Sequence, residues 1–98
     1  MRLSDDYVSA IKHAAREAFG PGAVVRLFGS RVHDHLRGGD IDLHLEVDPG
    51  RGTDAELDVF EALLFARIEP QRVDKVFTVR GEPIGPFEQI ALRDGIVL

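Results

Sequence analysis

The feature that most constrains this chain is a strict alternation of apolar and polar residues that begins at Asp40 and ends at Val47. Apolar side chains stand at every second position, at Ile41, Leu43, Leu45 and Val47. Successive side chains of a β-strand point to opposite faces, so the pattern predicts a strand over Ile41–Val47 with one buried face and one polar face that Asp40 leads. Asp40 and Asp42 then point to the same side of the sheet. Two neighbouring carboxylates repel each other unless a cation lies between them.

A second apolar segment, Ala23–Phe28, precedes this strand and ends in Gly29 and Ser30. Its valines predict another buried strand, although Arg26 interrupts the apolar run. Glycine lets backbone N–H groups approach a phosphate closely. Carboxylate oxygens suit Mg²⁺, which commonly binds one or two carboxylates together with phosphate oxygens of a substrate. The two segments together therefore predict a site for a nucleoside triphosphate and magnesium.

Helical spacing marks two other segments of the chain. Ser4 is a candidate N-cap, and the apolar residues that follow it recur at helical intervals, at Val8, Ile11, Ala15 and Ala18. Thr53 and Glu56 form a capping-box pattern, and this second helix is expected to run to about Arg67. Its apolar stripe is expected to face the core and consists of Leu57, Phe60, Leu63 and Leu64.

The last third of the chain predicts a strand over residues 73–79 that carries Asp74, a short helix over 87–93 and an apolar tail over 96–98. Residues 31–37 suit either a short helix or a loop. The resulting order is helix, strand, strand, helix, strand, short helix. This order predicts an α+β fold (an α/β sandwich), with helices packed on a small mixed β-sheet. A length of 98 residues predicts a single domain over residues 1–98.

Composition and charge narrow the function classes. Seventeen acidic and 12 basic residues give a net charge of −5, so direct nucleic-acid binding is not expected, because gripping phosphates calls for a basic patch. The absence of cysteine excludes thiolate zinc sites and cysteine nucleophiles, and it fits a reducing compartment. The start of the chain is charged, and no apolar run approaches membrane-spanning length. We therefore expect a cytoplasmic protein that makes no membrane contact.

The arrangement Gly29-Ser30, nine further residues, then Asp40-Ile41-Asp42-Leu43 resembles the signature of the nucleotidyltransferases of the DNA polymerase beta superfamily. The short chain resembles the minimal nucleotidyltransferase branch, which has a polymerase beta-like palm fold. The resemblance is strongest from Val24 to Glu46 and extends to Asp74, about half the chain. Many minimal members carry Ala-Arg-Gly after Gly-Ser-Arg and a serine before the first aspartate. Val32-His33-Asp34 and Gly39 stand at those places here.

The resemblance implies three catalytic carboxylates that together ligate two Mg²⁺ ions, namely Asp40, Asp42 and Asp74. Gly29 and Ser30 would hold the β- and γ-phosphates of ATP, and Arg31 would be a further nucleotide contact. Arg37 is a second candidate for a phosphate contact, and the alternative for both arginines is that they pair with Asp34 at the surface. A nucleoside monophosphate, AMP in the first instance, would be transferred to a hydroxyl, and pyrophosphate would leave without any protein nucleophile.

The resemblance also implies a partner. Minimal members are often encoded beside an all-helical protein of the HEPN type, and this chain would act as the antitoxin that adenylylates a tyrosine of that partner. Two other functions stay open. One is a small-molecule nucleotidyltransferase subunit similar to the aminoglycoside-modifying enzymes. The other is a binding module that neutralises or scaffolds a helical partner without catalysis. The sequence leaves open whether the chain forms a homo-oligomer.

Each motif also has an ordinary structural interpretation. Gly29 and Ser30 are common turn residues, and aspartates on alternate strand positions are common on a solvated face. The spacing of His33, His35 and His44 matches no zinc pattern, so these histidines are expected at the surface or at the rim of the site. His44 shares the predicted face of Asp42.

Overall fold

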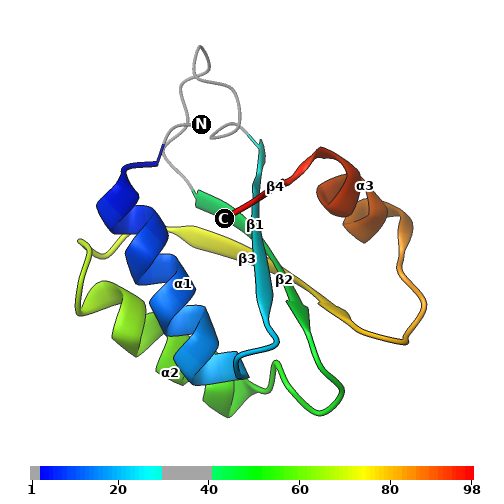
Figure 1. The fold of residues 1–98 in the computed structure, drawn as a ribbon, viewed down its shortest axis with the longest axis horizontal. Coiled ribbons are helices and arrows are strands. Elements are labelled where there is room, and N and C mark those ends of the chain that lie inside the picture. Colours follow the sequence, from blue (N-terminus) through cyan, green and yellow to red (C-terminus); the bar gives the residue numbers. More distant parts are fainter. Residues whose placement is uncertain (1–2, 30–40) are drawn as a thin grey trace.

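The computed structural model describes residues 3–29 and 41–98, and in this part of the chain three helices pack on a four-stranded sheet (Figure 1). The elements are α1 (Asp5–Phe19), β1 (Val24–Phe28), β2 (Ile41–Val47), α2 (Asp54–Phe65), β3 (Val73–Val79), α3 (Pro86–Asp94) and β4 (Ile96–Val97). The predicted α+β fold is confirmed. The strands predicted over 41–47 and 73–79 have the expected bounds, and the other predicted elements differ by one or two residues at an end.

The sheet has the strand order β3-β2-β1-β4. β1 pairs antiparallel with β2 and with β4, whereas β2 and β3 are parallel and are connected through α2. Figure 1 shows β2 and β3 side by side in the same direction, with β1 next to them. This topology places the C-terminal end of β1 at the same end of the sheet as the first residues of β2 and β3, with β2 between the other two strands. The predicted site residues that the structure describes, Gly29, Asp42 and Asp74, lie at this end.

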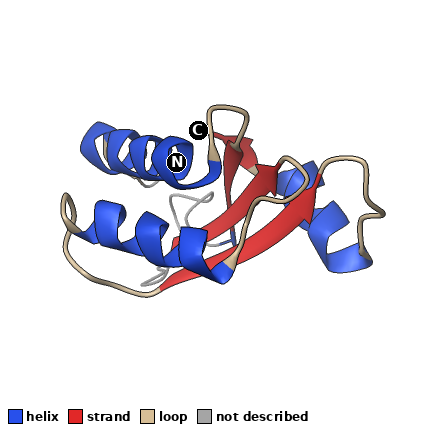
Figure 2. Ribbon diagram, turned by 90° about the horizontal axis from the view of Figure 1, so that it is seen from below, coloured by secondary structure: helices blue, strands red, loops and turns tan. Residues whose placement is uncertain are grey.

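One face of the sheet packs against α1 and α2, which Figure 2 shows lying together on one side of the strands. The alternation of apolar and polar residues along β2 makes this face apolar. Its four apolar side chains are fully buried here. Phe19 of α1 stacks on Phe60 of α2 with ring centroids 5.4 Å apart, and it meets Phe77 of β3 edge to face at 5.5 Å. The predicted stripe of α2 faces this core.

Both predicted helix caps form. The Ser4 hydroxyl accepts a hydrogen bond from the Tyr7 N–H at 3.2 Å, and the Thr53 hydroxyl accepts one from the Glu56 N–H at 3.2 Å. α2 ends at Phe65, slightly before the predicted end. A tighter turn follows the helix. In it the N–H groups of Arg67 and of the next residue both donate to the Leu64 carbonyl at 3.0 Å.

The apolar tail, for which the sequence predicted no strand, forms β4 against β1. Val97 pairs with Arg26 and Ile96 with Leu27. α3 precedes β4 and packs on the opposite face of the sheet from α1 and α2, where the Phe28 and Phe87 rings meet edge to face at 6.2 Å. We call this second face the polar face, since it carries Asp42, His44 and Glu46 of β2.

Candidate functional site

The parallel register of β2 and β3 sets Asp42 directly beside Asp74. Neighbouring strands lie about 4.8 Å apart, and paired residues point to the same face. The two carboxylates, separated by 32 positions in the sequence, therefore share one end of the polar face. The register thus brings together Asp42 and Asp74, two of the residues that were predicted to share a site. We call this end, with Gly29, the acidic end of the polar face.

Gly29 follows the last residue of β1 and lies against the Asp42 carboxylate. Its φ of +78° falls in the left-handed region, which residues with a side chain rarely adopt. A Cβ atom placed on Gly29 would collide with an Asp42 carboxylate oxygen. The backbone of residue 29 therefore approaches this carboxylate as closely as it does only because the residue is glycine.

Three of the predicted site residues, Ser30, Arg31 and Asp40, lie outside the described residues. Asp74 lies within them and is partly exposed, with an ion pair to the exposed Arg72 at 3.2 Å. Among the described residues there is no group of three or more histidines or carboxylates arranged to hold a metal ion. Two of the three predicted metal ligands, Asp42 and Asp74, are thus adjacent, and the third is not described.

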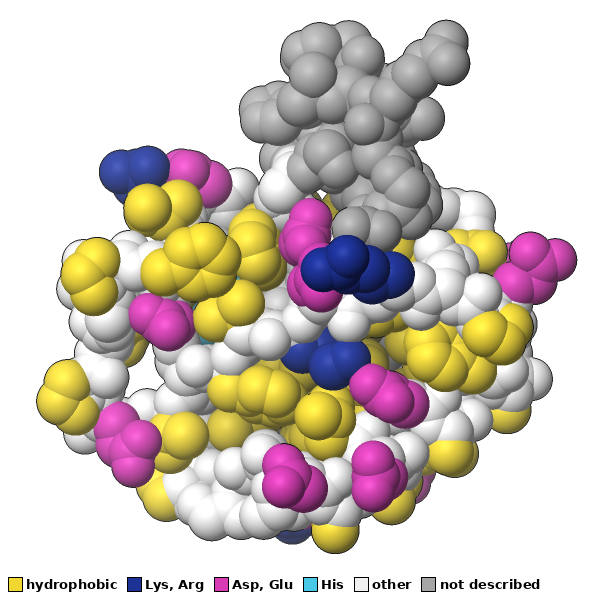
Figure 3. Space-filling model, turned by 180° about the vertical axis from the view of Figure 1, so that it is seen from behind, with side chains coloured by type: hydrophobic (Ala, Val, Ile, Leu, Met, Phe, Trp, Pro, Cys, Tyr) yellow, Lys and Arg dark blue, Asp and Glu magenta, His cyan; other side chains and the backbone are white. Residues whose placement is uncertain are grey.

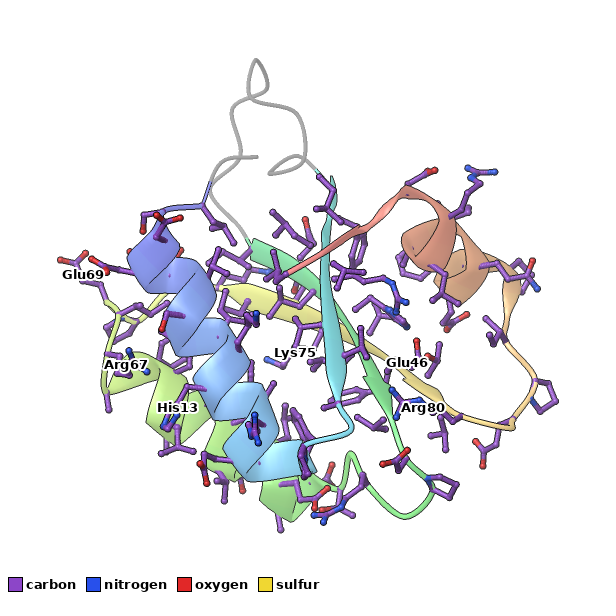
Figure 4. The ribbon with its side chains drawn as sticks, viewed as in Figure 1. His13, Glu46, Arg67, Glu69, Lys75 and Arg80 are labelled. Atoms are coloured by element: carbon purple, nitrogen blue, oxygen red, sulfur yellow. The ribbon has the colours of Figure 1, made fainter. Side chains whose placement is uncertain are left out.

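A network of alternating charges occupies the other end of the polar face. Glu46 of β2 accepts a hydrogen bond from Arg26 of β1 at 2.9 Å and forms an ion pair with Arg80 at 3.0 Å. Arg80 also reaches Asp48 at 2.7 Å. Figure 4 shows Glu46 and Arg80 lying close together where β2 and β3 end. We call this the ion-paired end of the polar face.

The ion pairs shift the pKa values of their members. The hydrogen bond from Arg26 holds the pKa of the Glu46 carboxyl below its ordinary value, and Arg80 acts in the same direction. The hydrogen bond to Asp48 raises the pKa of Arg80 further above its usual range. Both ions therefore stay charged through the physiological pH range. This end of the polar face is stabilised by its own charges.

His44 lies between the two ends and does not occupy the surface or rim position expected of it. It is fully buried, and its Nε2 lies 2.9 Å from the hydroxyl of Thr78, itself only 8% exposed. Burial lowers the pKa of His44 from its usual 6.5, and the Arg26 guanidinium lowers the pKa further. The shared face with Asp42 was predicted. The burial was not, because the sequence does not show that α3 packs on this face.

Hydrophobic side chains border the site over α3. Figure 3 shows the face opposite Figure 1, where apolar side chains gather on the side of α3 and charged side chains lie towards the middle. Ile84, Phe87 and Ile90 are 38%, 57% and 49% exposed. Phe87 reaches the acidic end through Phe28, the residue paired with Asp42. An exposed apolar group of this kind is typical of a surface that contacts another molecule.

A scan of protein-family models and a search of curated protein sequences both find no match to this chain. Within the described ranges, the helices are too short or too polar for any of them to cross a membrane.

Proposed function

We propose that this protein is a magnesium-dependent nucleotidyltransferase that moves a nucleoside monophosphate, AMP from ATP, to a hydroxyl acceptor. The observation that carries the proposal is the paired position of Asp42 and Asp74 beside the positive-φ Gly29. Two carboxylates held side by side repel each other and favour a bound divalent cation. The resemblance of the motif to the minimal nucleotidyltransferases supports the same conclusion.

The residues present fit a metal–triphosphate complex. Asp42 and Asp74, with Asp40, would hold two Mg²⁺ ions, and the open backbone at Gly29, with Ser30 and Arg31, would hold the phosphates. When bound, the ions neutralise phosphate charge and polarise the reacting phosphoryl group. Because residue 29 is glycine, no side chain of its own fills the space next to the Asp42 carboxylate.

The proposed reaction is an in-line displacement at phosphorus. The acceptor hydroxyl oxygen forms a bond to the α-phosphorus of ATP, and the bond from that phosphorus to the bridging oxygen breaks. Pyrophosphate leaves with the electrons of the broken bond, and the hydroxyl proton passes to solvent. No covalent bond to the protein forms, so the chain needs no nucleophile.

The acceptor that we favour is a tyrosine of a helical HEPN-type partner. Ile84, Phe87 and Ile90 offer an apolar surface next to the acidic end, which suits a protein better than a small polar acceptor. This places the chain as the antitoxin of such a pair, acting in the cytoplasm. A small-molecule acceptor, as in the aminoglycoside-modifying enzymes, would instead make no use of that apolar surface.

The test follows the two ends of ATP separately. The chain and the helical protein that co-purifies with it are incubated with Mg²⁺ and with ATP labelled at either the α- or the γ-phosphorus. Nucleotidyl transfer leaves the α-label on the acceptor and releases the γ-label as pyrophosphate. Asp42→Asn should abolish labelling. The matched control is Glu46→Gln, which makes the same chemical change on the same strand and face at the ion-paired end, and it should keep the activity.

A second candidate function is a binding module that neutralises or scaffolds its partner by contact alone. The exposed apolar side chains of α3 favour it, since they need no chemistry at the acidic end. Tight association without α-label on the partner, unchanged by Asp42→Asn, would support this function.

A further inference from the structure

A groove of about 610 Å³ runs between α1 and the edge of the sheet formed by β1 and β4. Its lining includes Val8, Lys12, Arg16, Val25, Val97 and Leu98. We call it the edge groove. Gly29, Asp42 and Asp74 do not line it, so the groove is separate from the acidic end.

The basic side chains of α1 along the edge groove have no ion-pair partner among residues 3–29 and 41–98. Six cations of the described residues form ion pairs, namely Arg26, Arg51, Arg72, Lys75, Arg80 and Arg93. Lys12, Arg16 and Arg67 form no ion pair with any residue that the structure describes. Two of these three line the edge groove, one helical turn apart, and His13 lies beside them. In a protein of net charge −5, this concentration of unpaired positive charge favours an anionic ligand.

The floor of the edge groove is apolar and its far wall is a strand edge. Val25 is buried, while Val8 and Leu98 are partly buried against the core. β4 is the last strand of the sheet in the described part of the chain. The Leu98 N–H donates to the Val25 carbonyl at 2.9 Å, so the alternation of an antiparallel ladder turns the N–H and C=O of Val97 away from β1.

We propose that the edge groove binds an extended segment of another protein in which acidic and apolar residues alternate. The backbone pairs with the edge of the described sheet at Val97. The acidic side chains then point to the α1 side and meet Lys12 and Arg16, and the apolar side chains point to the opposite side, next to the 58% exposed side chain of Val97. This is strand addition to a sheet edge beside a helix. Asp5 and Arg16 mark the ends of the lining on α1 and lie about 17 Å apart along the helix, a length that an extended segment of about five residues covers.

The apolar floor favours such a peptide over nucleic acid. A phosphate backbone presents closely spaced charges and no apolar side chains, and it calls for a longer run of cations than Lys12, His13 and Arg16 supply. Asp5 at one end of the groove would also repel a continuous line of phosphates. An alternating peptide places its acidic side chains over this floor and against the cations, and its apolar side chains next to Val97 on the other side of the sheet.

The experiment measures fluorescence anisotropy with a labelled peptide of about six residues that alternates glutamate and valine. A peptide alternating lysine and valine and a labelled oligothymidylate are the comparison probes. The variant is Lys12→Glu with Arg16→Glu, and the matched control is Arg67→Glu. Arg67 is the other cation without an ion pair to a described residue, and Figure 4 shows it beyond the end of α2, away from β1 and β4.

We expect the acidic peptide to bind the wild-type chain about tenfold more tightly than the basic peptide. The double variant should weaken that binding at least about tenfold, and Arg67→Glu by less than about twofold. Amide chemical shifts in the wild-type chain should move along α1 and at Val97 and Leu98. This map tests the site even if the double variant folds poorly.

Five results would overturn the proposal. The first is equal binding of the acidic and basic peptides. The second is tighter binding of the oligothymidylate than of the acidic peptide. The third is a loss of affinity in Arg67→Glu as large as that in the double variant. The fourth is a map of chemical-shift changes centred elsewhere in the chain. The fifth is self-association of the wild-type chain that the double variant abolishes, which would assign the groove to a second copy.

Discussion

The two ends of the polar face lie on the same strands and use their charges in opposite ways. At the ion-paired end, Glu46 lies between Arg26 and Arg80, and each charge meets its opposite at hydrogen-bonding distance. At the acidic end, the register of β2 and β3 places two carboxylates side by side, those of Asp42 and Asp74.

The ion pairs around Glu46 are explained by their contribution to the stability of the fold. At the acidic end, Asp74 pairs with the exposed Arg72 and two like charges still share one site, which is the arrangement that a divalent cation stabilises. This contrast is the physical basis for placing function at the acidic end.

The largest expected effect comes from Asp42→Asn. Loss of one metal ligand should remove several kcal/mol of transition-state stabilisation and lower the transfer rate by about 10³-fold or more. The asparagine keeps the shape of the side chain and relieves repulsion with Asp74, so the free energy of unfolding should stay within about 0.5 kcal/mol of wild type. Single-turnover labelling and urea denaturation measure the two quantities. A folded variant that labels its partner at the wild-type rate would contradict the assignment.

Gly29→Ala should disturb the acidic end through its shape alone. The added Cβ must both adopt a φ near +78° and displace the Asp42 carboxylate. We expect a loss of more than about 2 kcal/mol of stability together with loss of transfer.

Gly50→Ala is the matched control for this substitution. Gly50 has a similar φ of +84° but no atom within 4 Å of the added Cβ, so it isolates the backbone cost of about 1–2 kcal/mol. Equal losses of stability and full activity in both variants would show that contact with Asp42 is unimportant.

Glu46→Gln should cost stability where Asp42→Asn does not. The amide leaves Arg26, only 18% exposed, and Arg80 without a full counter-charge, and we expect a loss of about 1–2 kcal/mol in urea denaturation. Transfer measured well below the melting temperature should be retained. A destabilisation by Asp42→Asn as large as that by Glu46→Gln would remove the contrast between the two ends.

The smallest expected effect is a dependence of the free energy of unfolding on pH. It arises from His44, which lies between the two ends of the polar face. Its pKa in the folded state lies below the usual 6.5, so the unfolded chain binds a proton that the folded chain does not. Stability is therefore greatest above pH 6.5 and falls as the pH drops from 6.5 through the lowered pKa of His44. Urea denaturation across this window measures the slope. His44→Gln should flatten it.

The sequence predicted the elements of this fold because its periodicities are clear. Alternation gave β2, helical stripes and caps gave α1 and α2, and the position of Asp74 on a strand was predicted too. β4 was missed because two exposed apolar residues have no period and gain a strand only from pairing with β1. Local pattern does not encode such a pairing.

The face on which the candidate site lies could be predicted from the sequence for a similar reason, but the packing around it could not. Because side chains alternate along a β-strand, the sequence shows which of them share a face. The common face of Asp42, His44 and Glu46 was therefore predictable. What covers that face depends on where α3 packs, and therefore the burial of His44 was not. The pairing of Arg26 with Glu46 depends on the register between β1 and β2, which neither strand sets alone.

The most direct measurement of the central claim is paramagnetic broadening of amide resonances by Mn²⁺ in the presence of ATP, because Mn²⁺ accepts the same oxygen ligands as Mg²⁺. We predict that the resonances of Gly29, Asp42 and Asp74 broaden first, that those of Glu46 and Arg80 stay sharp, and that Asp42→Asn removes the effect. Broadening centred on the ion-paired end, or unchanged by Asp42→Asn, would contradict a metal–triphosphate site at the acidic end.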